Sequence, residues 1–165
     1  MTRRDPLARY VRAHGVGART GQELFARSAR SQLDPEVRRQ LRDLSEEIAA
    51  DRLALQGILD LLGTRIHPVT ERLAVVAERV GRLKPNGSLL RRTRLSDLVE
   101  LEALSAAVQA KRLGWEALRE VAEDDERLDA AQLDCLIDRA RDQEDRLDGM
   151  RLSVSRELLG HDRGG

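Results

Sequence analysis

Apolar residues recur at steps of three and four along most of this chain, and no segment alternates strictly between apolar and polar positions. Such spacing places apolar side chains on one face of an α-helix. Three stripes are clearest: Leu41, Leu44, Ile48, Leu55 and Leu62; Leu98, Leu101, Leu104, Val108, Trp115 and Leu118; and Leu133, Leu136, Ala140, Leu147 and Val154. The pattern predicts an all-α protein whose long helices each bury one face.

Capping residues indicate where these helices begin and end. An aspartate that can cap a helix stands directly before proline twice, at Asp5-Pro6 and Asp34-Pro35. Ser96 and Asp129 can cap two later helices. We therefore expect four main helices over residues 6–31, 35–62, 96–122 and 130–159, within a single domain spanning residues 1–165.

A connection of about 30 residues separates the second main helix from the third. It contains a proline start at Pro68 and an apolar stripe of Leu73, Val76 and Val80, which predict a shorter fifth helix over residues 68–82. Short links join the other helix pairs, so each pair is expected to be an antiparallel hairpin. A long crossover between two hairpins is the connectivity of ferritin-like four-helix bundles.

Four segments support a resemblance to known proteins. Residues 21–24 (GQEL), 47–52 (EIAADR), 81–87 (GRLKPNG) and 98–104 (LVELEAL) resemble segments of a family of uncharacterised bacterial helical-bundle proteins. That likeness extends over most of the chain and implies no particular activity. The topology is similar to that of the ferritin-like superfamily, which implies a search for a dimetal carboxylate site.

Composition indicates the cellular compartment in which the protein is expected. The lone cysteine, Cys135, excludes an internal disulfide, and no apolar leader is visible, so we expect a cytoplasmic protein. Abundant arginine with few lysines is typical of a high-GC bacterial genome. The longest apolar runs are too short for a membrane span of roughly 20 residues.

Net charge is zero, but basic residues dominate the first helix and acidic ones the last, so we expect these two helices to lie side by side.

Several acidic residues near the middle of the predicted helices are candidates for a site: Glu23, Glu47, Asp51, Glu102 and Glu144. Asp51 lies on the apolar stripe of the second helix, and Glu144 lies on that of the last. An unpaired buried carboxylate is costly, so these groups need cationic partners. In one interpretation Lys111 and nearby arginines form a buried polar network with them. In the other, the five carboxylates bind two iron or manganese ions.

The first interpretation predicts a non-catalytic structural or protein-interaction module without a cofactor. The second predicts a dimetal oxidase or a metal-storage protein, although no histidine follows a glutamate by three residues as the ferritin-like metal motif requires. A homodimer or another protein partner is expected in the first case, because the stripe of Leu73, Val76 and Val80 offers an apolar surface.

Basic residues in the long connection suggest a third possibility, a phosphate-binding or nucleic-acid-binding adaptor. They are Arg82, Lys84, Arg91, Arg92 and Arg94. Zero net charge is atypical of nucleic-acid binders, so this interpretation ranks last.

Glycines in the first helix also require an explanation, because each one weakens a helix by up to about 1 kcal/mol. Gly17 and Gly21 lie one turn apart. We expect them to permit the close approach of another helix, with a kink or a cofactor groove as the alternatives.

Overall fold

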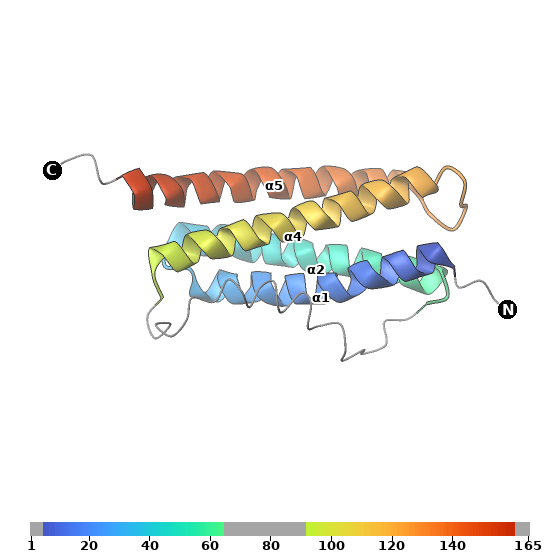
Figure 1. Ribbon diagram of the computed structural model, residues 1–165, viewed down its shortest axis with the longest axis horizontal. Helices are drawn as coiled ribbons and strands as arrows, with labels where there is room; N and C mark the ends of the chain where they lie inside the picture. The colour runs from blue at the N-terminus through green and yellow to red at the C-terminus, as the bar shows by residue number, and fades with distance from the viewer. Residues whose placement is uncertain (1–4, 65–91, 161–165) are drawn as a thin grey trace.

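The computed structural model describes residues 5–64 and 92–160, which form an elongated bundle of four helices (Figure 1). These are α1 (Pro6–Ser31), α2 (Pro35–Leu61), α4 (Arg94–Val121) and α5 (Ala130–Leu159).

 The described part of the chain contains helices and no strand, so the prediction of an all-α helical bundle is confirmed. The shorter helix expected over residues 68–82 lies outside the described residues.

Local capping determines where the helices begin. The side chain of Asp5 accepts a hydrogen bond from the amide of Leu7 at 3.0 Å, and that of Asp129 accepts one from Gln132 at 3.1 Å. α4 begins at Arg94, two residues earlier than expected, because Thr93 rather than Ser96 is its N-cap. The hydroxyl of Thr93 accepts the Ser96 amide at 3.2 Å, which places Ser96 inside the first turn.

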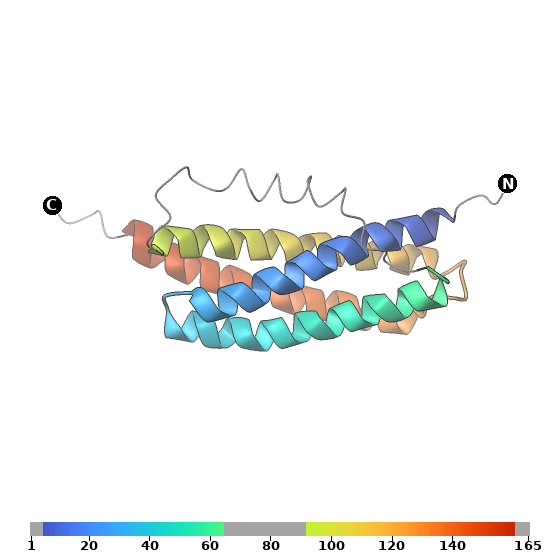
Figure 2. The same ribbon diagram turned by 90° about the horizontal axis from the view of Figure 1, so that it is seen from below.

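The four helices form two antiparallel hairpins, α1–α2 and α4–α5, and α2 and α4 begin at the same end of the bundle (Figures 1 and 2). α1 lies beside α2 and α4, whereas α5 lies beside α4 and α2. The expectation that the first and last helices pair is therefore wrong, since α1 and α5 are diagonal. Charged side chains of α1 and α5 form ion pairs with α4 instead. Arg27 of α1 pairs with Glu100 at 3.2 Å, and Asp134 of α5 pairs with Arg119 at 2.9 Å.

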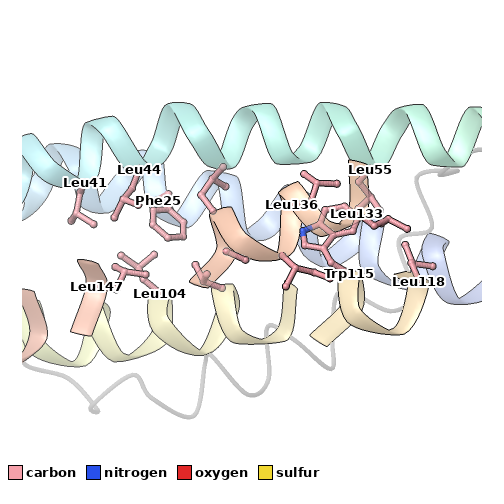
Figure 3. Packing of buried hydrophobic residues seen from close by; sticks show 14 of the residues in the cluster. Phe25, Leu41, Leu44, Leu55, Leu104, Trp115, Leu118, Leu133, Leu136 and Leu147 are labelled. Carbon is pink, nitrogen blue, oxygen red and sulfur yellow. The ribbon is translucent and has the colours of Figure 1, made fainter. Parts of the chain in front are cut away.

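Apolar side chains from all four helices fill the space between the hairpins (Figure 3). One group in the figure contains Phe25, Leu41, Leu44, Leu104 and Leu147, and a second contains Leu55, Trp115, Leu118, Leu133 and Leu136. Complete burial of one such side chain stabilises the folded state by about 1.5–3 kcal/mol. The two hairpins are therefore held together mainly by this shared core.

Close approach of α1 and α4 occurs at Gly114, against the side chain of His14. A Cβ atom added to Gly114 would lie 2.8 Å from Cε1 of His14, and the His14 ring packs against Tyr10 with ring centroids 4.7 Å apart. Around Gly17 and Gly21, by contrast, a Cβ atom would have no neighbour within 4 Å among the described residues. The close approach expected at these two glycines is thus found elsewhere on the same interface.

We expect Gly114→Ala to destabilise the protein by about 1–3 kcal/mol relative to Gly57→Ala, because the new methyl group must displace the His14 ring. Gly57 is the matched control, since its added Cβ atom meets nothing within 4 Å and alanine favours the helix by up to about 1 kcal/mol. Chemical denaturation measures both changes. His14→Ala should abolish the difference, and a difference that persists in that background would contradict the packing argument.

Candidate functional site

The carboxylate of Asp51 on α2 lies near the centre of the bundle and is bonded from the opposite hairpin. Asp51 is only 2% exposed and lies between Ile48 and Leu55 on the buried face of α2. Lys111 of α4 donates a hydrogen bond to Oδ2, and Nε of Arg139 on α5 donates one to Oδ1 at 2.7 Å. One buried anion therefore contacts two cations from two other helices.

A buried glutamine extends this arrangement. Gln143 of α5 is fully buried; its Nε2 donates to Oε2 of Glu47 at 3.0 Å and to Oδ2 of Asp51 at 3.3 Å. Its Oε1 accepts a hydrogen bond from Lys111. Arg146 donates to the other oxygen of Glu47 at 2.7 Å. We name this set the Asp51 network, and its members are Glu47, Asp51, Lys111, Arg139, Gln143 and Arg146.

The Asp51 network contains three basic and two acidic groups, and Asp142 brings a third acidic group to it. Arg146 contacts Asp142 at 3.0 Å, so three basic groups face three acidic ones. Burial lowers the pKa of the Lys111 ammonium, and the negative charge of Asp51 opposes this effect. Hydrogen bonds to Asp51 and Gln143 occupy two of the three hydrogens of the protonated amine. The arrangement is therefore that of an internally neutralised ionic cluster.

Three of the acidic residues expected at the site lie outside this network. Glu23 is exposed and pairs with Arg19 at 3.3 Å, and Glu102 is also exposed. Glu144 pairs with Arg112 at 2.9 Å, and its side chain is 26% exposed. The structure places these three residues outside the network. Glu102 and Glu144 each follow a buried residue by one position, and Glu23 lies two positions before the buried Phe25.

Other members of the network were missed from the sequence, although their spacing contains a signal. Gln143, not Glu144, continues the buried stripe between Ala140 and Leu147, at steps of three and four. Arg139 and Arg146 lie seven residues apart, two helical turns, on either side of Gln143. A helical register centred on Gln143 would have identified both arginines.

The five carboxylates proposed as metal ligands do not converge. Only Glu47 and Asp51 share the network, through Gln143. Within residues 5–64 and 92–160, no group of three or more histidine, cysteine, aspartate or glutamate side chains is placed to hold a metal ion. His67 and His161 lie outside these ranges, while His14 packs against Tyr10.

Two residues of the proposed phosphate-binding set are described, and both are bonded to carboxylates. Arg92 donates to Oδ1 of Asp97 at 2.5 Å and to the hydroxyl of Ser31 at 2.6 Å, and it also pairs with Glu100. Arg94 pairs with Glu157. At these two positions a phosphate would have to compete with carboxylates. Arg82, Lys84 and Arg91 lie outside the described residues.

An apolar groove of about 540 Å³ lies between α1 and α4, above α2. Each wall contains several small residues: Gly17, Ala18 and Gly21 on α1, and Ala103, Ala106, Ala107, Ala110 and Gly114 on α4. Larger apolar side chains, among them Leu24, Phe25 and Trp115, also line it. Ile48 and Leu55 of α2 also line it. We call this feature the α1–α4 groove. Its size is typical of sites that accept a ligand or an apolar segment of chain.

The described residues define an all-α four-helix bundle with a buried ionic network and an adjoining apolar groove, which Asp51 and Lys111 also line. None of the described helices is both long and apolar enough to cross a membrane. Comparison with protein-family models, curated proteins and solved structures finds no significant match to the chain.

We expect Asp51→Asn to lower the free energy of unfolding by about 2–4 kcal/mol, because Lys111 and Gln143 remain buried beside a group without charge. Glu102→Gln, on the exposed face of α4, is the control and should change stability by no more than about 0.5 kcal/mol. Urea denaturation compares the two variants. Lys111→Met should cost less in the Asp51→Asn background than in the native protein. Strictly additive costs would show that Asp51 and Lys111 are not coupled.

Burial lowers the pKa of His14 below its ordinary value of 6.5. As the pH falls through that value, the unfolded chain binds a proton more readily than the folded protein does, so the free energy of unfolding decreases. Above it both forms are neutral and this contribution vanishes. We expect the urea midpoint of the native protein to fall more steeply below about pH 6.5 than that of His14→Gln. Parallel pH profiles would contradict this assignment.

Proposed function

We propose that this chain is a non-catalytic helical-bundle module with ferritin-like connectivity, which acts in the bacterial cytoplasm as a structural or protein-interaction unit. The common starting end of α2 and α4 supports this connectivity, because a chain that joins them must travel the length of the bundle. The resemblance to bacterial helical-bundle proteins at residues 21–24, 47–52, 81–87 and 98–104 supports the same assignment.

The pairing of Asp51 is the main support for a non-catalytic role. Ferritin-like dimetal proteins direct carboxylates and histidines into the bundle core, where they are free to bind metal. Here both oxygens of the central carboxylate accept hydrogen bonds from cations. A divalent ion would have to displace Lys111 and Arg139, and among the described residues no histidine is grouped with these carboxylates as a ligand. We therefore propose that the Asp51 network replaces the metal site of this architecture.

A homodimer or another protein partner completes the proposal. Large apolar side chains project from the outer surfaces of α2 and α5, including Leu53 at 64% exposure, Leu61 at 67% and Leu159 at 67%. Single exposed leucines are common on proteins, but those on one helix can contribute to a shared contact surface.

Metal analysis tests this proposal directly. We expect protein purified without chelator, then incubated with iron, manganese or zinc and desalted, to retain much less than one equivalent of metal, and Asp51→Ala to retain no less. Inductively coupled plasma mass spectrometry measures the metal content. About one or two equivalents in the native protein, lost in Asp51→Ala, would favour the dimetal oxidase or storage function instead.

A further inference from the structure

The two interfaces between the hairpins are closed in different ways. Along α2 and α5, the Asp51 network fills the interface with hydrogen bonds. Along α1 and α4, the middle of the interface is the α1–α4 groove, whose walls combine glycine and alanine with larger apolar side chains. Small wall residues allow the backbone of an added helix to approach closely, and amphipathic helices bind to apolar grooves of this kind.

Both ends of the connection between α2 and α4 are bonded to α1, one wall of the groove. At the first end, Arg12 donates to the hydroxyl of Thr64 through Nε at 3.2 Å and Nη2 at 2.5 Å, and Thr64 is only 6% exposed. At the other end, Arg92 donates to the hydroxyl of Ser31 at 2.6 Å. The connection therefore starts near the beginning of α1 and finishes beside its last residue.

The length of the connection suits a path along the groove. Arg12 and Ser31 are nineteen residues apart on α1, about 29 Å at the helical rise. A helix over the fifteen residues 68–82 would cover about 22 Å of that distance. Twelve further residues, at 65–67 and 83–91, remain to form the two links. The same chain can thus span the groove with a helix and a turn at each end.

The apolar stripe of that segment matches the groove in chemistry. We propose that residues 68–82 dock as a helix in the α1–α4 groove of their own chain, with Leu73, Val76 and Val80 directed into it. The attachment points make this helix run in the same direction as α1. Leu73 then lies nearest Gly17 and Ala110, and Val80 lies nearest Leu24 and Ala103. This inference is independent of the proposed function, because it rests on the groove and on the two attachment points.

Burial of the stripe would also alter the surface available to partners. Leu73, Val76 and Val80 would no longer offer the exposed apolar patch on which the sequence-based expectation of a dimer depends. The leucines on α2 and α5 would remain accessible. A second copy of the chain is the competing occupant, and both experiments below distinguish it from the chain's own segment.

Cysteine cross-linking in the full-length chain tests the docking and its direction. With Cys135→Ser as the background, we expect the pair Leu73→Cys and Ala110→Cys to form a disulfide within one chain under mild oxidation. The control pair, Val80→Cys and Ala110→Cys, should react several-fold more slowly because Val80 lies about two helical turns, roughly 10 Å, further along than Leu73. Non-reducing electrophoresis and mass spectrometry distinguish products within one chain from those between two. A dominant product between two chains, or equal rates for both pairs, would overturn the proposal.

A matched pair of substitutions tests which face is buried. Val76 and Val75 are adjacent, but on a helix Val75 lies on the side opposite Leu73, Val76 and Val80. We expect Val76→Asp to lower the thermal midpoint by about 4–8 °C and to remove hydrogen-exchange protection from residues 68–82, whereas Val75→Asp changes neither. Equal effects of the two substitutions, or no protection in the native protein, would contradict docking. Protection that disappears on dilution would indicate a second copy as the occupant.

Discussion

The buried carboxylate of Asp51 is the constraint on which the relative placement of the two hairpins depends. Apolar burial stabilises the bundle, but it is non-directional and would tolerate several alignments of leucine layers. Hydrogen bonds from Lys111 and Arg139 are directional, and both come from the opposite hairpin. A shift of α2 by one turn would leave a charge buried without its partners, at a cost of several kcal/mol. The network therefore selects one alignment among those that the core would accept.

A second polar cluster, around Asp97, also fixes the position of one hairpin relative to the other, at one end of the bundle. The amide of Leu33, in the link between α1 and α2, donates to Oδ2 of Asp97 at 2.9 Å, and Arg92 bonds to the other oxygen. Asp97 is only 3% exposed. The first turn of α4 is thus fixed to the α1–α2 link, while Arg127 contacts Asp5 at 3.2 Å near the opposite end. The interface of α1 with α4 is joined at its ends and lined by small residues between them.

Features determined by neighbouring residues could be predicted from the sequence, whereas those determined by helix placement could not. Asp5 and Asp34 cap the helices that follow them, and Asp51 is buried as its place between two apolar residues indicates. Glu144 was expected in the core because both Gln143 and Glu144 fit steps of three and four between Ala140 and Leu147, so spacing alone does not distinguish them. The pairing of α1 with α5 failed for a different reason: opposite charge does not identify neighbours when every helix has several oppositely charged surfaces available.

The groove and the buried ionic cluster are mechanically linked. Lys111 of α4 lines the groove and also donates a hydrogen bond to Asp51 of α2. Near the two ends of the same interface, the bonds of Asp97 to Leu33 and of Arg127 to Asp5 hold the hairpins together. Widening the middle of the groove would therefore move Lys111 away from Asp51. The width of the groove and the length of this central ion pair are coupled coordinates, so whatever occupies the groove also acts on the buried carboxylate.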